Sequence, residues 1–100
     1  MAYDAMLAER VRHEMINNVP DVEEKERIGG LAFMVHGKMF VCVQENNLLL
    51  ACNPNQAEEL LRHPGVSHYE MDGWLIIGPE GTDGKNISFW VSTALAWNSK

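Results

Sequence analysis

The chain has 100 residues, of which 46% are hydrophobic and 22% charged, a balance that is ordinary for one globular domain. Fourteen acidic and eight basic side chains give a net charge of −6, and because the lysines and arginines are scattered along the chain, we expect no autonomous binding to nucleic acid. The sequence contains neither a run of about 20 apolar residues that could cross a membrane nor a signal peptide at its start, so we expect a cytoplasmic protein without membrane association.

The first predicted element is a helix that Asp4 caps and that runs to about Asn18. Leu7, Val11 and Met15 repeat every four residues and predict its buried stripe. The charged segment 22–27, VEEKER, predicts a short exposed edge strand, because edge strands tolerate Lys and Glu.

Residues 29–52, GGLAFMVHGKMFVCVQENNLLLAC, predict an antiparallel meander. Three apolar runs are separated by turn signals at His36-Gly37 and at Asn46-Asn47, and two-residue hairpin loops suit these gaps. The predicted strands are Leu31–Val35, Met39–Gln44 and Leu48–Cys52, and the glycines with a predicted role in bends are Gly29, Gly30 and Gly37.

Both faces of this meander are apolar, whereas a sheet covered on one side alternates more cleanly. We therefore expect the second face to be covered by the chain termini, by a helix or by another subunit, and a homodimer is one possible outcome.

The two cysteines are expected to stay reduced on opposite faces of the sheet. If the turn between their strands holds an even number of residues, even-numbered residues of one strand share a face with odd-numbered residues of the next. Cys42 and Cys52 are both even, so a disulfide between them is excluded.

The second half of the chain predicts a helix, a strand and a further helix. Asn53 and Pro54 open the middle helix, residues 66–73 form a connector, Trp74–Ile77 is a fifth strand, and Gly78–Asn86 is a glycine-rich loop. The inward residues of the last helix are Ile87, Trp90, Val91, Ala94 and Leu95. The chain as a whole therefore predicts one α+β domain, residues 1–100, with an antiparallel meander sheet of about five strands flanked by an N-terminal, a middle and a C-terminal helix.

On the last helix, Phe89, Thr93 and Trp97 form a second apolar flank. A helix that is apolar on two flanks is either deeply buried or meets a partner. We keep these three residues as a candidate interaction surface.

We expect no catalytic residues, no cofactor and no metal site. The histidines lack metal-ligand spacing, and the serines and cysteines lack an adjacent base. The leading hypothesis is a non-enzymatic interaction domain. The alternative is a small-molecule-binding protein or minor enzyme that uses the Gly78–Asn86 loop and the region of His68, Tyr69 and Trp74, and a cavity lined by these three side chains would favour it.

The order of these segments resembles the TfoX/Sxy N-terminal domain family. The resemblance rests on MAYDAMLAERVR at the start, GGLAFMVHGKMFVCV, MDGW at 71–74 followed by GPEG, and FWVSTALAW near the end. It implies a helix-flanked antiparallel sheet and a stand-alone domain without the second, C-terminal domain of better-known members. Those members are regulators of competence genes that work with a transcription activator, so the resemblance implies a regulatory role through protein partners, with the transcription machinery as one candidate.

Overall fold

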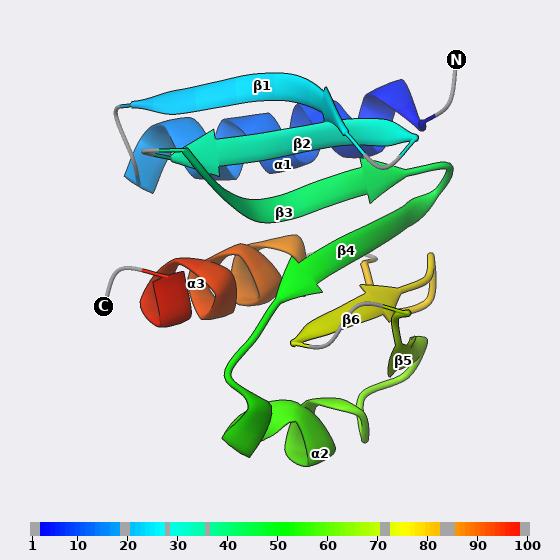
Figure 1. Ribbon diagram of the computed structural model, residues 1–100. Helices are drawn as coiled ribbons and strands as arrows, with labels where there is room; N and C mark the ends of the chain where they lie inside the picture. Colours follow the sequence, from blue (N-terminus) through cyan, green and yellow to red (C-terminus); the bar gives the residue numbers. More distant parts are fainter. Residues whose placement is uncertain are drawn as a thin grey trace.

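The computed structural model describes residues 3–18, 21–27, 29–35, 37–70, 73–82 and 86–98. Within them the chain forms a six-stranded antiparallel sheet with three α-helices, so the predicted α+β class is confirmed (Figure 1). The strand order is β1-β2-β3-β4-β6-β5. The strands are β1 (Val22–Arg27), β2 (Gly30–Val35), β3 (Lys38–Gln44), β4 (Asn47–Ala51), β5 (Val66–His68) and β6 (Trp74–Ile77), and the helices are α1 (Ala5–Asn18), α2 (Ala57–Leu60) and α3 (Asn86–Asn98).

The first four strands form the predicted meander, and β1 is its edge strand. Gly29 has a φ of 72° and lies in the turn between β1 and β2, whereas Gly30 is already part of β2, where a side chain would collide with the carbonyl oxygen of Val43. Gly37 has a φ of 80°, whereas His36 lies outside the described residues. The last turn consists of Glu45 and Asn46, one residue earlier than predicted, with Glu45 at a φ of 53°.

The sheet has one strand more than the five expected. Residues 66–68 form β5, which pairs antiparallel with β6, so the prediction that residues 66–73 are only a connector was wrong for these three. A strand of three residues is too short to show an alternating pattern in the sequence. Its extended conformation is instead stabilised by pairing with β6.

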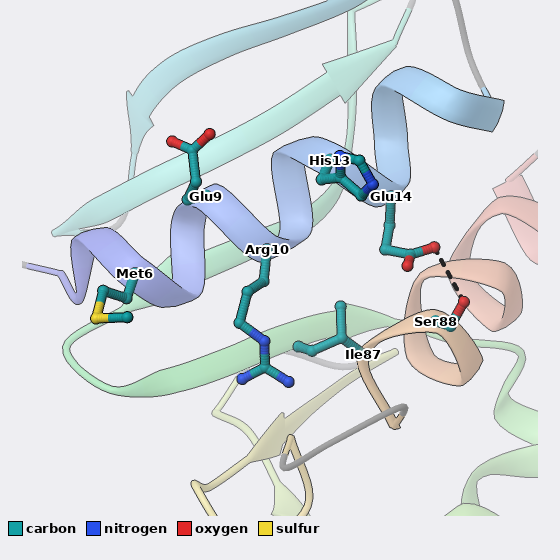
Figure 2. A pocket seen from close by; sticks show the side chains of 7 residues that line it. All are labelled: Met6, Glu9, Arg10, His13, Glu14, Ile87 and Ser88. Atoms are coloured by element: carbon teal, nitrogen blue, oxygen red, sulfur yellow. Dashed lines mark hydrogen bonds between the residues drawn. The ribbon is translucent and has the colours of Figure 1, made fainter.

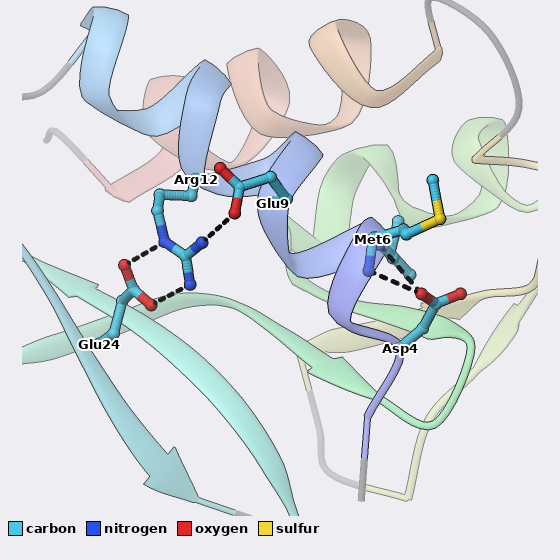
Figure 3. Close-up of polar contacts among 6 residues, drawn as sticks. Asp4, Met6, Glu9, Arg12 and Glu24 are labelled. Carbon is cyan, nitrogen blue, oxygen red and sulfur yellow. Dashed lines mark hydrogen bonds and ion pairs between the residues drawn. The ribbon is translucent and has the colours of Figure 1, made fainter. Parts of the chain in front are cut away.

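Helix α1 begins as predicted. The Asp4 carboxylate accepts hydrogen bonds from the backbone N–H groups of Met6 and Leu7, at 2.9 and 3.2 Å, which is N-cap geometry (Figure 3). The stripe of Leu7, Val11 and Met15 is buried.

An ion pair holds α1 against the edge of the sheet. The Arg12 guanidinium donates to both carboxylate oxygens of Glu24 on β1, at 2.6 and 2.7 Å, and to Glu9 one turn back on α1, at 2.6 Å (Figure 3). The hydrogen bond to Glu24 raises the pKa of Arg12, so the guanidinium stays charged at all ordinary pH values. This bidentate contact makes β1, otherwise a charged edge strand, part of the folded unit.

The middle helix is shorter than a normal helix. Asn53 caps a 3₁₀ turn, Pro54–Gln56, by accepting a hydrogen bond from the backbone N–H of Asn55 at 2.9 Å, and α2 follows directly. Leu60 is its buried residue.

Helix α3 contacts α1, β3 and β4 and carries the largest fully buried side chain, Trp90. The indole N–H of Trp90 donates to the carbonyl oxygen of Gly81 at 2.7 Å, so α3 is fixed to the turn that follows β6. The predicted inward residues of α3 are buried, apart from Leu95, which is half-buried.

All three helices pack against the same face of the sheet. Leu7, Leu60 and Trp90, from α1, α2 and α3, belong to one core cluster together with the strand residues Phe33 and Val41. Figure 1 looks onto the strands with α1 behind them. No helix in the described part of the chain therefore covers the second face of the sheet. The two termini, which were the other predicted cover within the chain, lie outside the described residues.

Candidate functional site

On the side of the sheet that no described helix covers, apolar side chains from several strands form a continuous cluster. We call it the open face. It consists of three buried residues, Ala32, Cys42 and Leu49, and five half-buried ones, Met34, Met39, Tyr69, Trp74 and Ile76. These side chains come from β2, β3, β4 and β6 and from the residue after β5.

The strand register arranges the open face in two rows across the sheet. The lysine row is Lys25, Ala32, Cys42, Leu49 and Ile76, each paired with the next on the neighbouring strand. The glutamate row consists of Glu23, Met34 and Met39, which are paired in this order, and of the pair Ala51 and Trp74, through which Ala51 lies on the same side as the open face. A bulge at Phe40 keeps Met39 on the open face while Phe40 itself joins the helix-side core.

The small residues at the centre are shielded by the longer ones around them. Ala32 and Cys42 have 0% exposure, although no described helix lies over them, whereas Met34 and Met39 are half-buried. Methionine is unbranched and polarizable, and it adapts its shape to whatever it contacts. Adaptable side chains of this kind are frequent at surfaces that bind other molecules.

The cysteines lie on opposite faces, as predicted. Cys42 belongs to the open face and Cys52 to the helix-side core, and both are free and buried. Desolvation raises the pKa of Cys42 from 9.0 to about 11, and burial raises the pKa of Cys52 as well. Both thiols are therefore protonated at neutral pH and are poor nucleophiles.

The predicted second flank of α3 does not enter the core. Phe89 is 44% exposed, and its ring lies 5.3 Å from the His63 ring and 4.9 Å from the Trp90 ring. Thr93 and Trp97 are half-buried, and the Thr93 hydroxyl donates to the carbonyl oxygen of Phe89 at 2.8 Å. The sequence left two alternatives for this flank, deep burial or contact with a partner. The exposure of Phe89 excludes deep burial for that residue.

A cavity of about 640 Å³ lies between α1 and α3 (Figure 2). Its lining residues are Met6, Glu9, Arg10, His13, Glu14, Ile87 and Ser88. The Ser88 hydroxyl donates to Glu14 at 2.9 Å and joins α3 to α1, whereas Arg10 donates to the carbonyl oxygen of Thr82, in the turn after β6, at 2.8 Å. Figure 2 shows Arg10 reaching toward Ile87, while Glu9 points away from α3.

Sequence reasoning missed this cavity. The α1 residues recur at helical spacing and could have been recognised as one stripe, but Ile87 and Ser88 are more than 70 positions away. Only the packing of α3 against α1 brings them together.

A second cavity, of about 440 Å³, is lined by the predicted trio His68, Tyr69 and Trp74 together with Cys52, Pro54, Ala57, Glu58, Gly73 and Leu75. Pairing puts His68 opposite Leu75, a helix-side core residue, whereas Tyr69 and Trp74 pack with the open face. The cavity therefore lies at the end of the sheet, and the two aromatic side chains pack mainly on the opposite side from His68.

The described portion of the glycine-rich loop does not line that cavity. The described portion, residues 78–82, forms structural hydrogen bonds: Gly78 N–H donates to Gly65 at 2.8 Å, and Gly81 and Thr82 accept from Trp90 and Arg10. The rest of the predicted loop up to Asn86 lies outside the described residues, and Asn86 is the first residue of α3. The site predicted for a small-molecule-binding protein combined this loop with His68, Tyr69 and Trp74. Within the described residues, the three side chains line one cavity, but the loop does not join them.

Two kinds of site are absent from the part of the chain that the structure describes. No cluster of three His, Cys, Asp or Glu side chains is arranged to hold a metal ion. No described helix has the length and apolar character needed to span a bilayer.

A six-stranded antiparallel sheet with helices on one face and an apolar, half-buried open face on the other defines a small α+β domain in which no described helix covers the second sheet face. The model of the TfoX N-terminal domain family matches residues 14–100. The chain therefore belongs to this family, as its sequence segments predicted. Comparison with curated proteins and with solved structures found no match.

Proposed function

We propose that this domain is a non-enzymatic regulatory module of the competence-regulator type, which acts in the cytoplasm by binding protein through its open face. The observation that carries the proposal is the open face itself: eight apolar side chains over four strands and the end of β5, on the side of the sheet that no described helix covers. Membership of the TfoX N-terminal domain family supports the regulatory part of the proposal.

The chemistry of the site favours binding over catalysis. The thiol at the centre of the open face, Cys42, has a pKa of about 11 and is protonated at neutral pH. Arg12 is held in the ion pair with Glu24, and Arg10 and Glu14 join α1 to residues of another element. These charged groups are engaged in holding the fold together, which leaves the open face as the better candidate for function.

The test is complementation in the organism that encodes the protein. Deletion of the gene should change a set of transcripts, and the wild-type chain should restore them. Met34→Glu, which puts a charge on the open face, should fail to restore them, whereas the matched control Met6→Glu should succeed because Met6 is 79% exposed on α1. Full complementation by Met34→Glu at wild-type protein level would contradict the proposal.

One observation favours the alternative function. His68, Tyr69 and Trp74 do line a common cavity, of a size that can hold a small ligand. If the domain acts by binding a small molecule there, His68→Ala should abolish complementation while Met34→Glu should retain it.

A further inference from the structure

We propose that the open face binds a second copy of this chain, in a two-fold arrangement that places the lysine row of one copy over the glutamate row of the other. The inference rests on the proposed function, since it names the protein that the open face binds. Three observations support a second copy as the occupant: the sizes of the paired side chains, the charges at one end of the rows, and the area of the sheet.

The two rows are complementary in size. Consider a two-fold axis that lies in the interface and runs across the strands, level with Phe33, Val41 and Leu50 between the rows. It brings each residue of the lysine row over its counterpart on the same strand of the other copy, which lies two positions away, or three on β3 because of the bulge at Phe40. Ala32 then meets Met34, Cys42 meets Met39, and Leu49 meets Ala51. In these three pairs a small residue faces a larger one, so the surfaces interdigitate there, and the fourth apolar pair, Ile76 over Trp74, joins two large side chains.

The charges at the end of the rows are self-complementary as well. Glu23 and Lys25 lie on the open-face side of β1, because they pair with Met34 and Ala32. Their side chains are 64% and 47% exposed, and their charged groups are 3.5 Å apart. The same two-fold axis places Lys25 of one copy over Glu23 of the other, twice per dimer. A patch that carries both signs in this way is self-complementary across a two-fold axis, as an isologous contact requires.

The sheet is large enough for a lasting dimer. Six strands spaced about 4.8 Å apart and about 17 Å long give a face of roughly 500 Å² per copy, or roughly 1,000 Å² for two. That reaches the lower limit of about 1,000 Å² for a specific interface. The apolar centre with a charged rim is also the usual anatomy of such a contact.

Sedimentation equilibrium from about 1 to 100 µM tests the inference. The wild-type chain should pass from 11.3 kDa to twice that mass. Met34→Glu should raise the dissociation constant at least about 100-fold, because it buries a charge against the partner, and Met6→Glu should leave it unchanged. Thermal unfolding at low concentration checks that both variants fold.

Charge reversal gives a second readout that does not disturb the core. Lys25→Glu and Glu23→Lys should each raise the dissociation constant about tenfold at low salt, and the double variant should return it to near the wild-type value. High salt should reduce all of these differences.

A mass of 11.3 kDa at every concentration would overturn the inference. So would a dimer that tolerates Met34→Glu but dissociates with Trp97→Ala, because the contact would then be the flank of α3. If the chain is a monomer and Met34→Glu still fails in complementation, the proposed function stands with a different protein on the open face. If the chain is a dimer and the monomeric variant complements fully, the proposed function fails instead.

Discussion

Burial of the Cys42 thiol makes the free energy of unfolding depend on alkaline pH. Cys42 has 0% exposure, and desolvation raises its pKa from 9.0 to about 11. Between these values the unfolded chain has lost the thiol proton while the folded protein keeps it. The folded state therefore binds more protons, and stability falls as pH rises through this window. Between pH 8 and pH 10 the loss from this one group amounts to about 1 kcal/mol.

Urea unfolding of the wild type and of Cys42→Ala at pH 8, 9 and 10 measures this loss. Other groups also titrate in this range, but they are common to both proteins and cancel in the difference. The stability gap between the two proteins should therefore shrink by about 1 kcal/mol from pH 8 to pH 10. Val43→Ala, a buried neighbour without a titratable group, should keep a constant gap to the wild type. Parallel pH profiles for the wild type and Cys42→Ala would show that the thiol is not desolvated.

Three further outcomes are expected. Trp90→Phe should lower the free energy of unfolding by about 2 kcal/mol in urea titrations, because it leaves a void and deprives the Gly81 carbonyl of its donor. A double-mutant cycle on Arg12→Ala and Glu24→Ala should give a coupling energy of about 1 kcal/mol that decreases at high salt. In mobility-shift assays at physiological salt the protein should not bind duplex DNA, given its net charge of −6, and salt-sensitive sub-micromolar binding would contradict this expectation.

The sequence predicted those parts of the fold whose signal is local. The four-residue repeat of Leu7, Val11 and Met15 and the carboxylate of Asp4 sufficed to place α1. The alternation of turns and apolar runs placed the meander to within one residue at each strand end. Strand β5 was missed because its three residues carry no periodicity and are ordered by pairing with β6.

The candidate sites were less predictable, because each depends on which elements meet. The apolar character of both sheet faces was visible in the sequence, but nothing in the strands tells which face receives the helices. Glu14 and Ser88, which share a hydrogen bond across the cavity between α1 and α3, are 74 positions apart. Similarly, His68 lines a cavity with Trp74 as predicted, but the register that sends their side chains to opposite faces emerges only from the pairing of β5 with β6.

The two faces of the sheet also differ in the kind of apolar side chain they carry, and this difference bears on what each face does. The helix-side core is built from rigid or branched residues such as Phe33, Val41 and Leu50, which fix one packing arrangement. At the centre of the open face, Ala32 and Cys42 are shielded by flexible methionines instead. A monomer can bury those small residues under Met34 and Met39, and the same methionines can move to receive another surface. The helix-side face thus specifies the fold, and the open face keeps the adaptability that the proposed binding requires.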